Sequence, residues 1–363
     1  MKPKFVFFIG TSAELIKLVP VISEFENSKI EYEIYSSGQT DLKQQELKEL
    51  LEIKIDKQLL GKPQNKTSIK VFGLWAINSL VMTVREFIKL PKETYIIVHG
   101  DTASSLIGSV AAKIMGLKIL HIEAGLRSFN FIQPFPEEIC RYITSKLADY
   151  HFCPNEWSVN NLKNYKGDKI NTLNNTSLES LYNGLKLKKI SKDIKNLNSS
   201  YFLLILHRQE NLLFKKDVTK KIIDIVSKFS KSNLKCVFVM HKLTENFLKE
   251  QGIYSEIVAN KNIILLPRTP YLEFINTIKS AKFLLTDGGS NQEEAFYLGK
   301  PTLILRNVTE RIEGLDENVI LMKEDFSILK NFLNNYQNFE REEVKAPAVL
   351  PSKIIINKLK EII

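Results

Sequence analysis

The chain has 363 residues, which is long for one compact core, so two domains of ordinary size are expected. Its 51 Lys and Arg residues exceed the 41 Asp and Glu residues by ten, a surplus that suits an anionic partner. The basic residues are spread along the chain, and RNA-binding aromatic motifs, zinc-finger spacings and basic heptads are absent from the sequence. The composition therefore favours a phosphate-bearing small ligand and argues against nucleic acid.

The three cysteines, Cys140, Cys153 and Cys236, are widely spaced and form no C-x-x-C pair. This pattern argues against a disulfide framework and against a structural zinc site, and it fits a reducing cytoplasm. The first apolar run is short and leads into Thr11-Ser12-Ala13-Glu14, which predicts a capping box at a helix start instead of a signal-peptide cleavage site. No apolar run is long enough to cross a bilayer, so we expect a cytoplasmic protein without a membrane span.

Short apolar runs alternate with longer helical patterns along the chain. In the first half, strands are expected at KFVFFIG, YEIYSSG, YIIVHGD, LKILHIEAG and YHFCPN, and helices at 14–26, 41–52, 102–116, 136–148 and 156–166. Residues 174–200 are polar and rich in Lys and Asn, so they form a candidate linker. Strands resume with YFLLILH, CVFVMH, NIILLP, FLLTDGG, PTLILR and NVILM, and SKIIINKLKEII predicts a final helix.

Continuous apolar strands between helices are typical of parallel sheets that helices cover on both faces. We therefore expect an α/β protein with two doubly wound, Rossmann-like domains. The N-terminal domain is expected at 1–172 and the C-terminal domain at 173–345, with a final helix at 346–363 that packs back towards the N-terminal domain.

Polar residues stand just after the predicted strands, where open parallel sheets bind their ligands. Asp101, Glu123 and His207 follow three of these strands, and Glu137 opens a helix. Ordinary structural roles are open to each of them: Asp101 as a helix N-cap, Glu123 as a partner of Arg127, and Glu137 as a complement to the helix dipole. Their convergence at strand ends favours chemistry.

The stretch TDGGSNQEEAFYLGKP allows two interpretations. Gly288-Gly289-Ser290 at a helix start is suited to hold phosphate, and Ser290 with Glu293 is also an ordinary capping pair. The fingerprints G-x-G-x-x-G, P-loop, H-x-H and H-E-x-x-H are absent, so neither a dinucleotide, ATP nor a metal is implied.

Six blocks of sequence, in this order, resemble the bacterial non-hydrolysing UDP-N-acetylglucosamine 2-epimerases over nearly the whole chain: GTSAELIKLVPVI, HGDTASSL, HIEAGLRSFNFIQPFPEEICR, LHRQEN, TDGGSNQEEAFYLGKP and LRNVTERIEG. The resemblance implies a glycosyltransferase-B-like fold with the active site in a cleft between the lobes, a homodimer, no cofactor, and supply of sugar nucleotide for surface polysaccharide. It also implies a reaction in which UDP is eliminated across C1 and C2 of the sugar and added back to the resulting glycal.

Residue roles follow from the same resemblance. Asp101, Glu123 and Glu137 would be the acid/base carboxylates, and His207 a phosphate-side or proton-transfer group. The UDP-sugar would be bound by Lys17, Arg141, Arg208, His241, Tyr271, Gly288, Gly289, Ser290 and Glu294, without a metal.

The chain departs from the family pattern at several places, two of which are the runs around His207 and His241. Ser12 stands where an arginine is usual, Thr40-Asp41 where His-Arg is usual, and Gly288-Gly289-Ser290 where Ser-Gly-Gly is usual. In the bacterial enzymes the region of Thr40-Asp41 contributes to an activating UDP-N-acetylglucosamine site. A glycosyltransferase of the same fold, a hydrolysing 2-epimerase and a binding protein without turnover are the alternatives, and the three retained carboxylates favour the epimerase.

Overall fold

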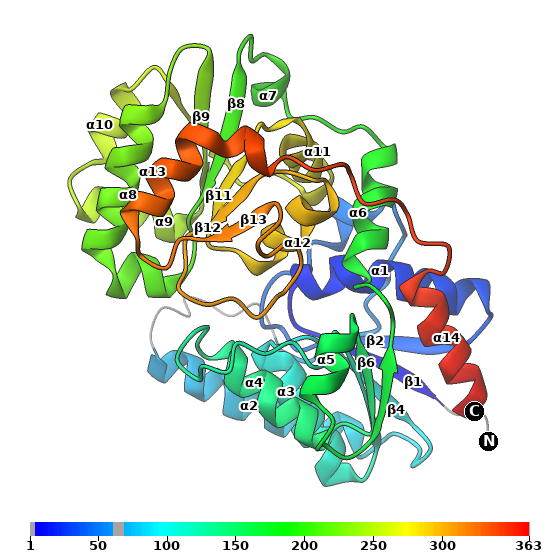
Figure 1. Cartoon of the computed structure of the whole chain (residues 1–363). Helices are drawn as coiled ribbons and strands as arrows, with labels where there is room; N and C mark the ends of the chain where they lie inside the picture. Colours follow the sequence, from blue (N-terminus) through cyan, green and yellow to red (C-terminus); the bar gives the residue numbers. More distant parts are fainter. Residues whose placement is uncertain (1–3, 61–68, 363) are drawn as a thin grey trace. The chain divides into compact units, whose positions relative to one another are not determined.

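The computed structural model describes residues 4–60 and 69–362, and the chain divides into two compact units (Figure 1). The first comprises Met1–Asn183 with Ala346–Ile363, and the second comprises Gly184–Lys345. The domain boundaries expected from the sequence, after residues 172 and 345, stay a prediction.

The first unit is built on a seven-stranded parallel sheet. Its strands lie in the order β3 (Lys57–Gln58), β2 (Tyr32–Ser36), β1 (Phe5–Ile9), β4 (Tyr95–His99), β5 (Lys118–Ile122), β6 (Tyr150–Cys153) and β7 (Asp168–Asn171). The order reverses direction between β1 and β4. That reversal is the switch point of a doubly wound sheet, outside which ligands bind.

Alternating side chains of β1 enter two different cores, because successive residues of a strand point to opposite faces. The ring of Phe7 packs edge-on against Phe25 of α1 (Ser12–Asn27), whereas Phe8 packs against Phe87 of α2 (Ile69–Phe87). Burial on both faces explains the unbroken apolar run of this strand.

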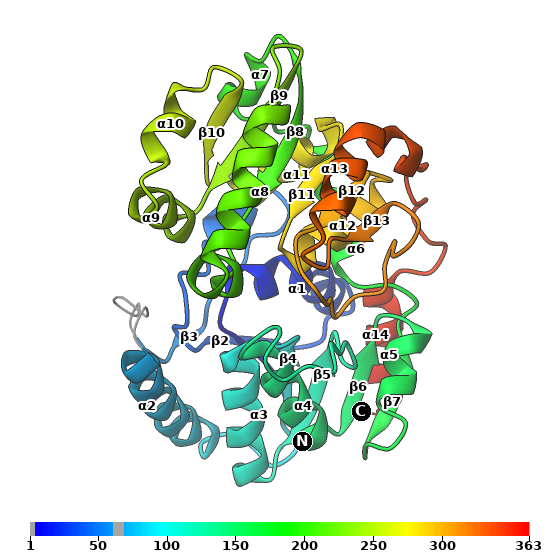
Figure 2. The same cartoon turned by 60° about the vertical axis from the view of Figure 1, so that its left-hand side comes forward.

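The other helices of the first unit are α3 (Ala103–Met115), α4 (Glu137–Leu147), α5 (Glu156–Asn161), α6 (Ser177–Lys186, which crosses into the second unit) and α14 (Pro351–Ile362). Helices α2, α3 and α4 follow one another along one side of the sheet (Figure 2). Helix α14 lies against α1, and Ser352 at its start donates two hydrogen bonds to the carboxylate of Glu179, at 2.7 Å from its backbone nitrogen and 2.6 Å from its hydroxyl.

Three expectations about helices were wrong or incomplete. Residues 41–52 contain only a 3₁₀ turn, η1 (Gln44–Leu47), which begins after Lys43 in a left-handed conformation. The candidate linker contains α6, whose Leu178 and Leu181 are fully buried. Helix α2 was not expected, because apolar residues on its exposed side blur the helical period.

The second unit repeats the same plan with six parallel strands. They lie in the order β10 (Ile263–Pro267), β9 (Leu234–Met240), β8 (Ser200–Ile205), β11 (Leu284–Thr286), β12 (Thr302–Ile304) and β13 (Val319–Leu321), so that the switch point falls between β8 and β11. The rings of Phe202 and Phe283, from β8 and the residue before β11, stack at 4.6 Å in its core.

Helical segments surround this second sheet: α7 (Lys192–Lys195), η2 (Glu210–Phe214), α8 (Lys216–Phe229), α9 (Lys242–Glu250), α10 (Tyr254–Ala259), α11 (Tyr271–Ser280), α12 (Gly289–Tyr297), α13 (Phe326–Asn335) and η3 (Tyr336–Phe339). The predicted class, two doubly wound α/β domains, is confirmed. That the two sheets face each other across a cleft stays a prediction.

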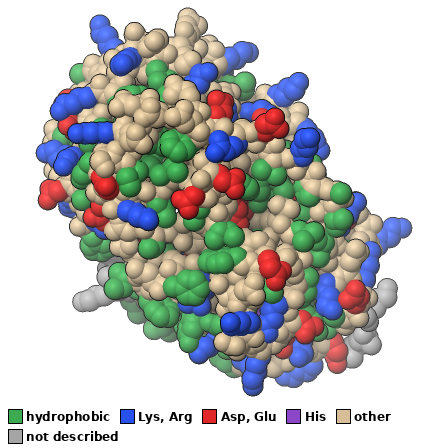
Figure 3. Space-filling model, in the orientation of Figure 1, with side chains coloured by type: hydrophobic (Ala, Val, Ile, Leu, Met, Phe, Trp, Pro, Cys, Tyr) green, Lys and Arg blue, Asp and Glu red, His purple; other side chains and the backbone are tan. Residues whose placement is uncertain are grey.

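Two surface features bear on the partners expected from the sequence. Lys and Arg side chains are scattered over the visible face, with acidic side chains between them, instead of gathering in one patch (Figure 3). Within residues 4–60 and 69–362, no helix has both the length and the apolar character needed to span a membrane.

Candidate active site

Three carboxylates lie at the ligand-binding edge of the first sheet. Asp101 and Glu123 follow the neighbouring strands β4 and β5, and Glu137 is the first residue of α4. The topology therefore brings the ends of the strands that carry Asp101 and Glu123 together, as the sequence predicted.

Glu123 is held in a strained and buried position. Its backbone has φ of +60°, which is uncommon for a residue with a side chain, and its exposed fraction is 6%. Its carboxylate lies 2.5 Å from the ammonium of Lys17 on α1 and also accepts a hydrogen bond from the amide of Asn175. The expected alternative partner, Arg127, binds Glu138 instead, at 2.5 Å. A buried ion pair kept at a strained residue is a common sign of a functional site.

Asp101 contacts the guanidinium of Arg141, which is itself almost fully buried on α4. Arg141 also lies 3.5 Å from the carboxylate of Glu138. The cap of α3 is Thr102, whose hydroxyl accepts a hydrogen bond from the backbone of Ser105 at 3.1 Å, so the interpretation of Asp101 as N-cap was wrong. The carboxylate of Asp101 is therefore oriented by a cation and not by the helix start.

Glu14 was expected only as part of a capping box, which is confirmed, but the structure gives it a larger set of contacts. One oxygen accepts hydrogen bonds from the backbones of Gly10 and Thr11, at 3.0 and 2.7 Å. The other accepts from the hydroxyls of Thr102 and Ser105, at 2.9 and 3.0 Å. Burial raises the pKa of Glu14 to about 7 despite these donors. Glu14 thus joins the loop after β1 to the start of α3, next to Asp101.

In the second unit, the turn after β11 is too crowded for side chains. A Cβ atom at Gly288 would lie 2.9 Å from Cε1 of His207, and one at Gly289 would lie 2.6 Å from Oε1 of Glu310. The N-cap of α12 is Gly288 without any side-chain cap, so Ser290, the second residue of the helix, is not the N-cap. Of the two interpretations of this stretch, the capping one was wrong, and the close backbone approach suits an anion.

His207, just after β8, lies between an acid and a second imidazole. Its Nδ1 is 3.1 Å from Oδ1 of Asp287, and its ring stacks on that of His241 with centroids 5.0 Å apart. Burial, and then the neighbouring His207, lower the pKa of His241 to about 4, so His241 is neutral at pH 7. The structure thus brings together His207, His241 and Gly288, as expected.

Two charged residues of the LRNVTERIEG block line the same region, although the sequence assigned them no role. Glu310 lies 3.0 Å from Arg306 and 3.8 Å from Arg208, and Arg311 lies 2.8 Å from Glu293. The match of this block to the family motif was the signal that pointed to them.

The last two predicted residues lie on two helices of the second unit, Glu294 within α12 and Tyr271 at the start of α11. Glu294 accepts a hydrogen bond from the amide of Asn291 at 3.1 Å. Tyr271 is the first residue of α11, and burial together with the charges of Glu294 and Glu293 raises its pKa well above the ordinary value. Ligand contacts of these residues stay predictions.

Two departures from the family pattern, at Ser12 and at Thr40-Asp41, lie close together in the structure. The hydroxyl of Ser12 donates to the carbonyl of Asp41 at 2.8 Å, and the backbone of Thr40 donates to Gly10 at 2.9 Å. Both departures therefore lie at the loop that follows β1.

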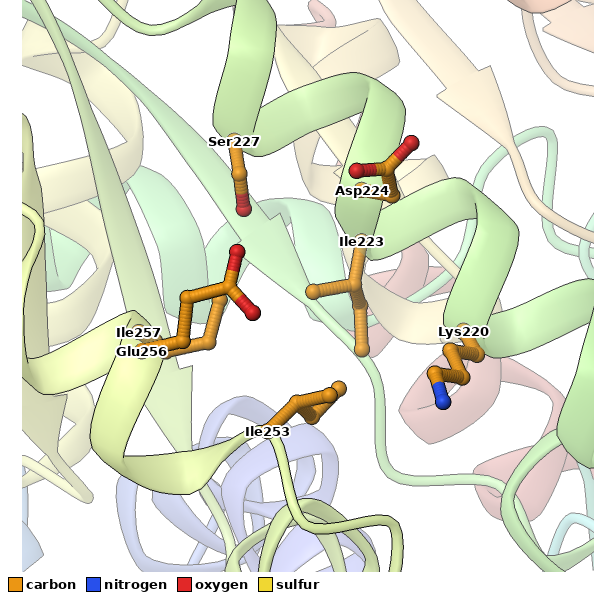
Figure 4. A pocket seen from close by; sticks show the side chains of 7 residues that line it. All are labelled: Lys220, Ile223, Asp224, Ser227, Ile253, Glu256 and Ile257. Atoms are coloured by element: carbon orange, nitrogen blue, oxygen red, sulfur yellow. The ribbon is translucent and has the colours of Figure 1, made fainter.

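A separate pocket lies between α8 and α10, and none of the predicted site residues lines it (Figure 4). Its apolar floor comes from Ile223, Ile253 and Ile257, with Lys220, Asp224, Ser227 and Glu256 around it. Among the described residues, no group of three or more His, Cys, Asp and Glu side chains is arranged to hold a metal ion.

The chain is similar in sequence and in fold to known proteins over nearly its whole length. A protein from Neisseria meningitidis named UDP-N-acetylglucosamine 2-epimerase is 31% identical over 379 residues, covering 98% of this chain and 99% of its own. The crystal structure of the Methanocaldococcus jannaschii UDP-GlcNAc 2-epimerase in complex with UDP-GlcNAc and UDP superposes with a TM-score of 0.82 at 26% identity, covering 99% of this chain and 100% of its own. For the Neisseria meningitidis enzyme bound to UDP-GlcNAc, the TM-score is 0.78 at 28% identity, with the same coverage.

The family model described as UDP-N-acetylglucosamine 2-epimerase matches residues 23–348. This range includes the carboxylates of the first sheet and the glycine turn of the second. The resemblance carried by the six sequence blocks is thereby confirmed: the chain belongs to the UDP-N-acetylglucosamine 2-epimerase family of enzymes.

Proposed function

We propose that this enzyme inverts C2 of UDP-N-acetylglucosamine, or of a closely related UDP-2-acetamido sugar, by eliminating UDP and adding it back to the glycal. The C2 proton of such a sugar is not acidic, so the route needs acid/base groups near the ring and a firm hold on the leaving diphosphate. The manno product would serve as a sugar nucleotide for surface polysaccharide.

The observation that carries this proposal is the pairing of two strand-end carboxylates with buried cations. Asp101 contacts Arg141, and Glu123 lies 2.5 Å from Lys17. The cations fix the orientation of carboxylates that would otherwise be costly to bury, which is what a group that moves a proton at one carbon requires. Glu137, on the helix that carries Arg141, is the third candidate.

Groups of the second unit are suited to the departing diphosphate. The backbone at Gly288 and Gly289 is open to close approach, His207 lies beside it, and Arg208 adds positive charge. Glu294 is suited to the ribose hydroxyls, and Tyr271 to the neighbourhood of the uracil.

Deuterium labelling tests the function directly. In deuterium oxide with UDP-N-acetylglucosamine, we expect deuterium at C2 of the recovered nucleotide sugars and no accumulation of UDP. Asp101→Asn should lower kcat by about 10²- to 10⁴-fold while UDP still binds. Asp224→Asn, on the exposed side of α8, is the matched control and should change nothing.

Three other results would contradict the proposal. Unlabelled nucleotide sugar without epimer, across several UDP-sugars, would remove it. Free sugar with accumulating UDP would identify a hydrolysing enzyme, and transfer to a glycan acceptor would identify a glycosyltransferase.

We further propose that the protein is a cytoplasmic homodimer. All three cysteines are buried and unbonded, which supports a reducing compartment. Helix α2 exposes the α2 stripe, Val71, Leu74, Ile77 and Val81, at intervals of three and four residues. An apolar helix face of this kind supports a contact with a second copy.

A further inference from the structure

Asp287 accepts hydrogen bonds from several residues that follow β8, in the part of the second unit proposed to bind the diphosphate. One of its carboxylate oxygens accepts hydrogen bonds from the backbone of Arg208 at 3.0 Å and from the amide of Asn211 at 3.1 Å. The backbone of His207 donates to both oxygens, at 3.1 and 3.2 Å. The Nδ1 of the His207 ring lies 3.1 Å from Oδ1, within ion-pair distance although the ring is not aligned for a hydrogen bond.

Neighbouring groups, the His207 ring and backbone N–H groups, stabilise the negative charge of the Asp287 carboxylate. Asp287 is fully buried, and burial alone would raise its pKa, but the facing His207 and the backbone N–H groups hold the pKa down to about 2. Asp287 is therefore ionised at any pH at which the enzyme would work. A buried negative charge favours the ring orientation that turns an N–H towards it.

The position of Asp287 in the fold connects two elements. Its backbone N–H donates to Ile205 at the end of β8, and Gly288, the next residue, begins the turn into α12. β8 and β11 are neighbours at the switch point of this sheet. Asp287 thereby joins the loop of His207 to the glycine turn.

We propose that Asp287 is a positioning residue: it holds the His207 ring with Nδ1 turned inward, which leaves Nε2 for the diphosphate of a nucleotide sugar. This rests on the proposed function for the identity of the ligand. A neutral imidazole carries its proton on one nitrogen only, so a carboxylate at Nδ1 selects the Nδ1–H form and leaves the Nε2 lone pair free. The ring of His241, stacked 5.0 Å away and neutral, limits rotation without competing for the proton.

Such a ring first takes a proton from solvent water at Nε2, and Asp287 balances the positive charge of the resulting imidazolium. It then donates this proton to the β-phosphate oxygen of departing UDP and recovers it when UDP adds back. After this first protonation the cycle consumes no further proton, because the same proton moves from Nε2 to the phosphate oxygen and back.

Nitrogen NMR of the wild-type protein, labelled with ¹⁵N-histidine, tests the ring orientation. The signal that is missing in His207→Gln identifies His207 among the five histidines. At a pH where the ring is neutral we expect the proton on Nδ1. A proton on Nε2 would overturn the proposal, whatever the protein catalyses and whether or not Asp287 variants fold.

Epimerase kinetics separate positioning from a merely structural role. We expect Asp287→Asn to lower kcat by about 10²-fold, part of what a positioned acid/base group contributes. In the His207→Gln background the same change should cost less than about twofold, because Asp287 acts through His207. Equal losses in both backgrounds would overturn the proposal, and Ser227→Ala, in the pocket beside α8, serves as the unaffected control.

The NMR and the kinetic experiments also distinguish a failure of this inference from a failure of the proposed function. A wild-type protein that epimerises no UDP-sugar would remove the proposed function, and the NMR result would still decide the ring orientation.

Discussion

Glu14 makes the stability of the first unit depend on pH. Because its folded pKa is raised from 4.5 to about 7, the native state binds more protons than the unfolded state between these values. Stability therefore falls as pH rises through this window, by up to about 3 kcal/mol.

The variant Glu14→Gln tests this sign. It removes the titration, so the difference in unfolding free energy between wild type and variant should change between pH 5 and pH 8. The amide would also direct an NH₂ group at donors such as Thr102, which should destabilise the variant by about 1–3 kcal/mol at pH 8. If thermal unfolding gives the same difference in unfolding free energy between the two proteins at every pH, the assignment of this titration to Glu14 is refuted.

At the residue scale, sequence reasoning found groups whose role depends on neighbours in the chain, such as the capping pair of Thr11 and Glu14. It missed partners that the fold brings from afar. Asn175 reaches Glu123 from a stretch that looked like a linker, and Asp287 reaches His207 across 80 positions. No local pattern encodes such pairs, because strand order decides which loops meet.

At the scale of elements, α14 begins at a buried hydrogen-bonded anchor. Ser352 and Glu179 are both buried, and the hydroxyl of Ser352 lies 2.6 Å from a carboxylate whose other oxygen accepts from the backbone of the same residue. Hydrogen bonds to a charged group contribute about 1.5–3 kcal/mol. We expect Ser352→Ala to lower stability by that order.

Hydrogen exchange is the measurement that localises this effect. The amides of α14 should lose protection in Ser352→Ala, while Asn357→Ala, an exposed change in the same helix, should leave them as they are. Unchanged exchange in α14 would show that its apolar side, which includes Ile355 and Leu359, is sufficient to hold it.

The sequence predicted the elements whose apolar residues form a clear pattern, and it failed for segments whose pattern fits more than one structure. The core strands stood out because both of their faces are buried. The helix expected at 41–52 is wrong although its composition is helical: Lys43 is left-handed, and the residues after it form only the 3₁₀ turn η1. Helix α6 forms in a polar stretch because tertiary packing buries two of its residues, Leu178 and Leu181.

At the scale of the whole molecule, the two sheets share one winding order, with the reversal between β1 and β4 in one and between β8 and β11 in the other. The sequence predicted two parallel sheets but not the order of their strands, which fixes the loops that meet at each switch point. Thr102 and Glu14 meet at one reversal, and Asp287 and His207 at the other, so the strand order explains why these separate motifs of the sequence lie together.

The α2 stripe carries the last prediction. Leu74 and Ile77 are 64% and 63% exposed, and burying such side chains against a second copy contributes about 1.5–3 kcal/mol each. Leu74→Glu with Ile77→Glu places like charges on both sides of a symmetric contact, so we expect the homodimer to become a monomer by light scattering. Lys220→Glu, a charge change on the second unit, should keep the dimer. A wild-type protein that is monomeric, or a double variant that stays dimeric, would assign the stripe another role.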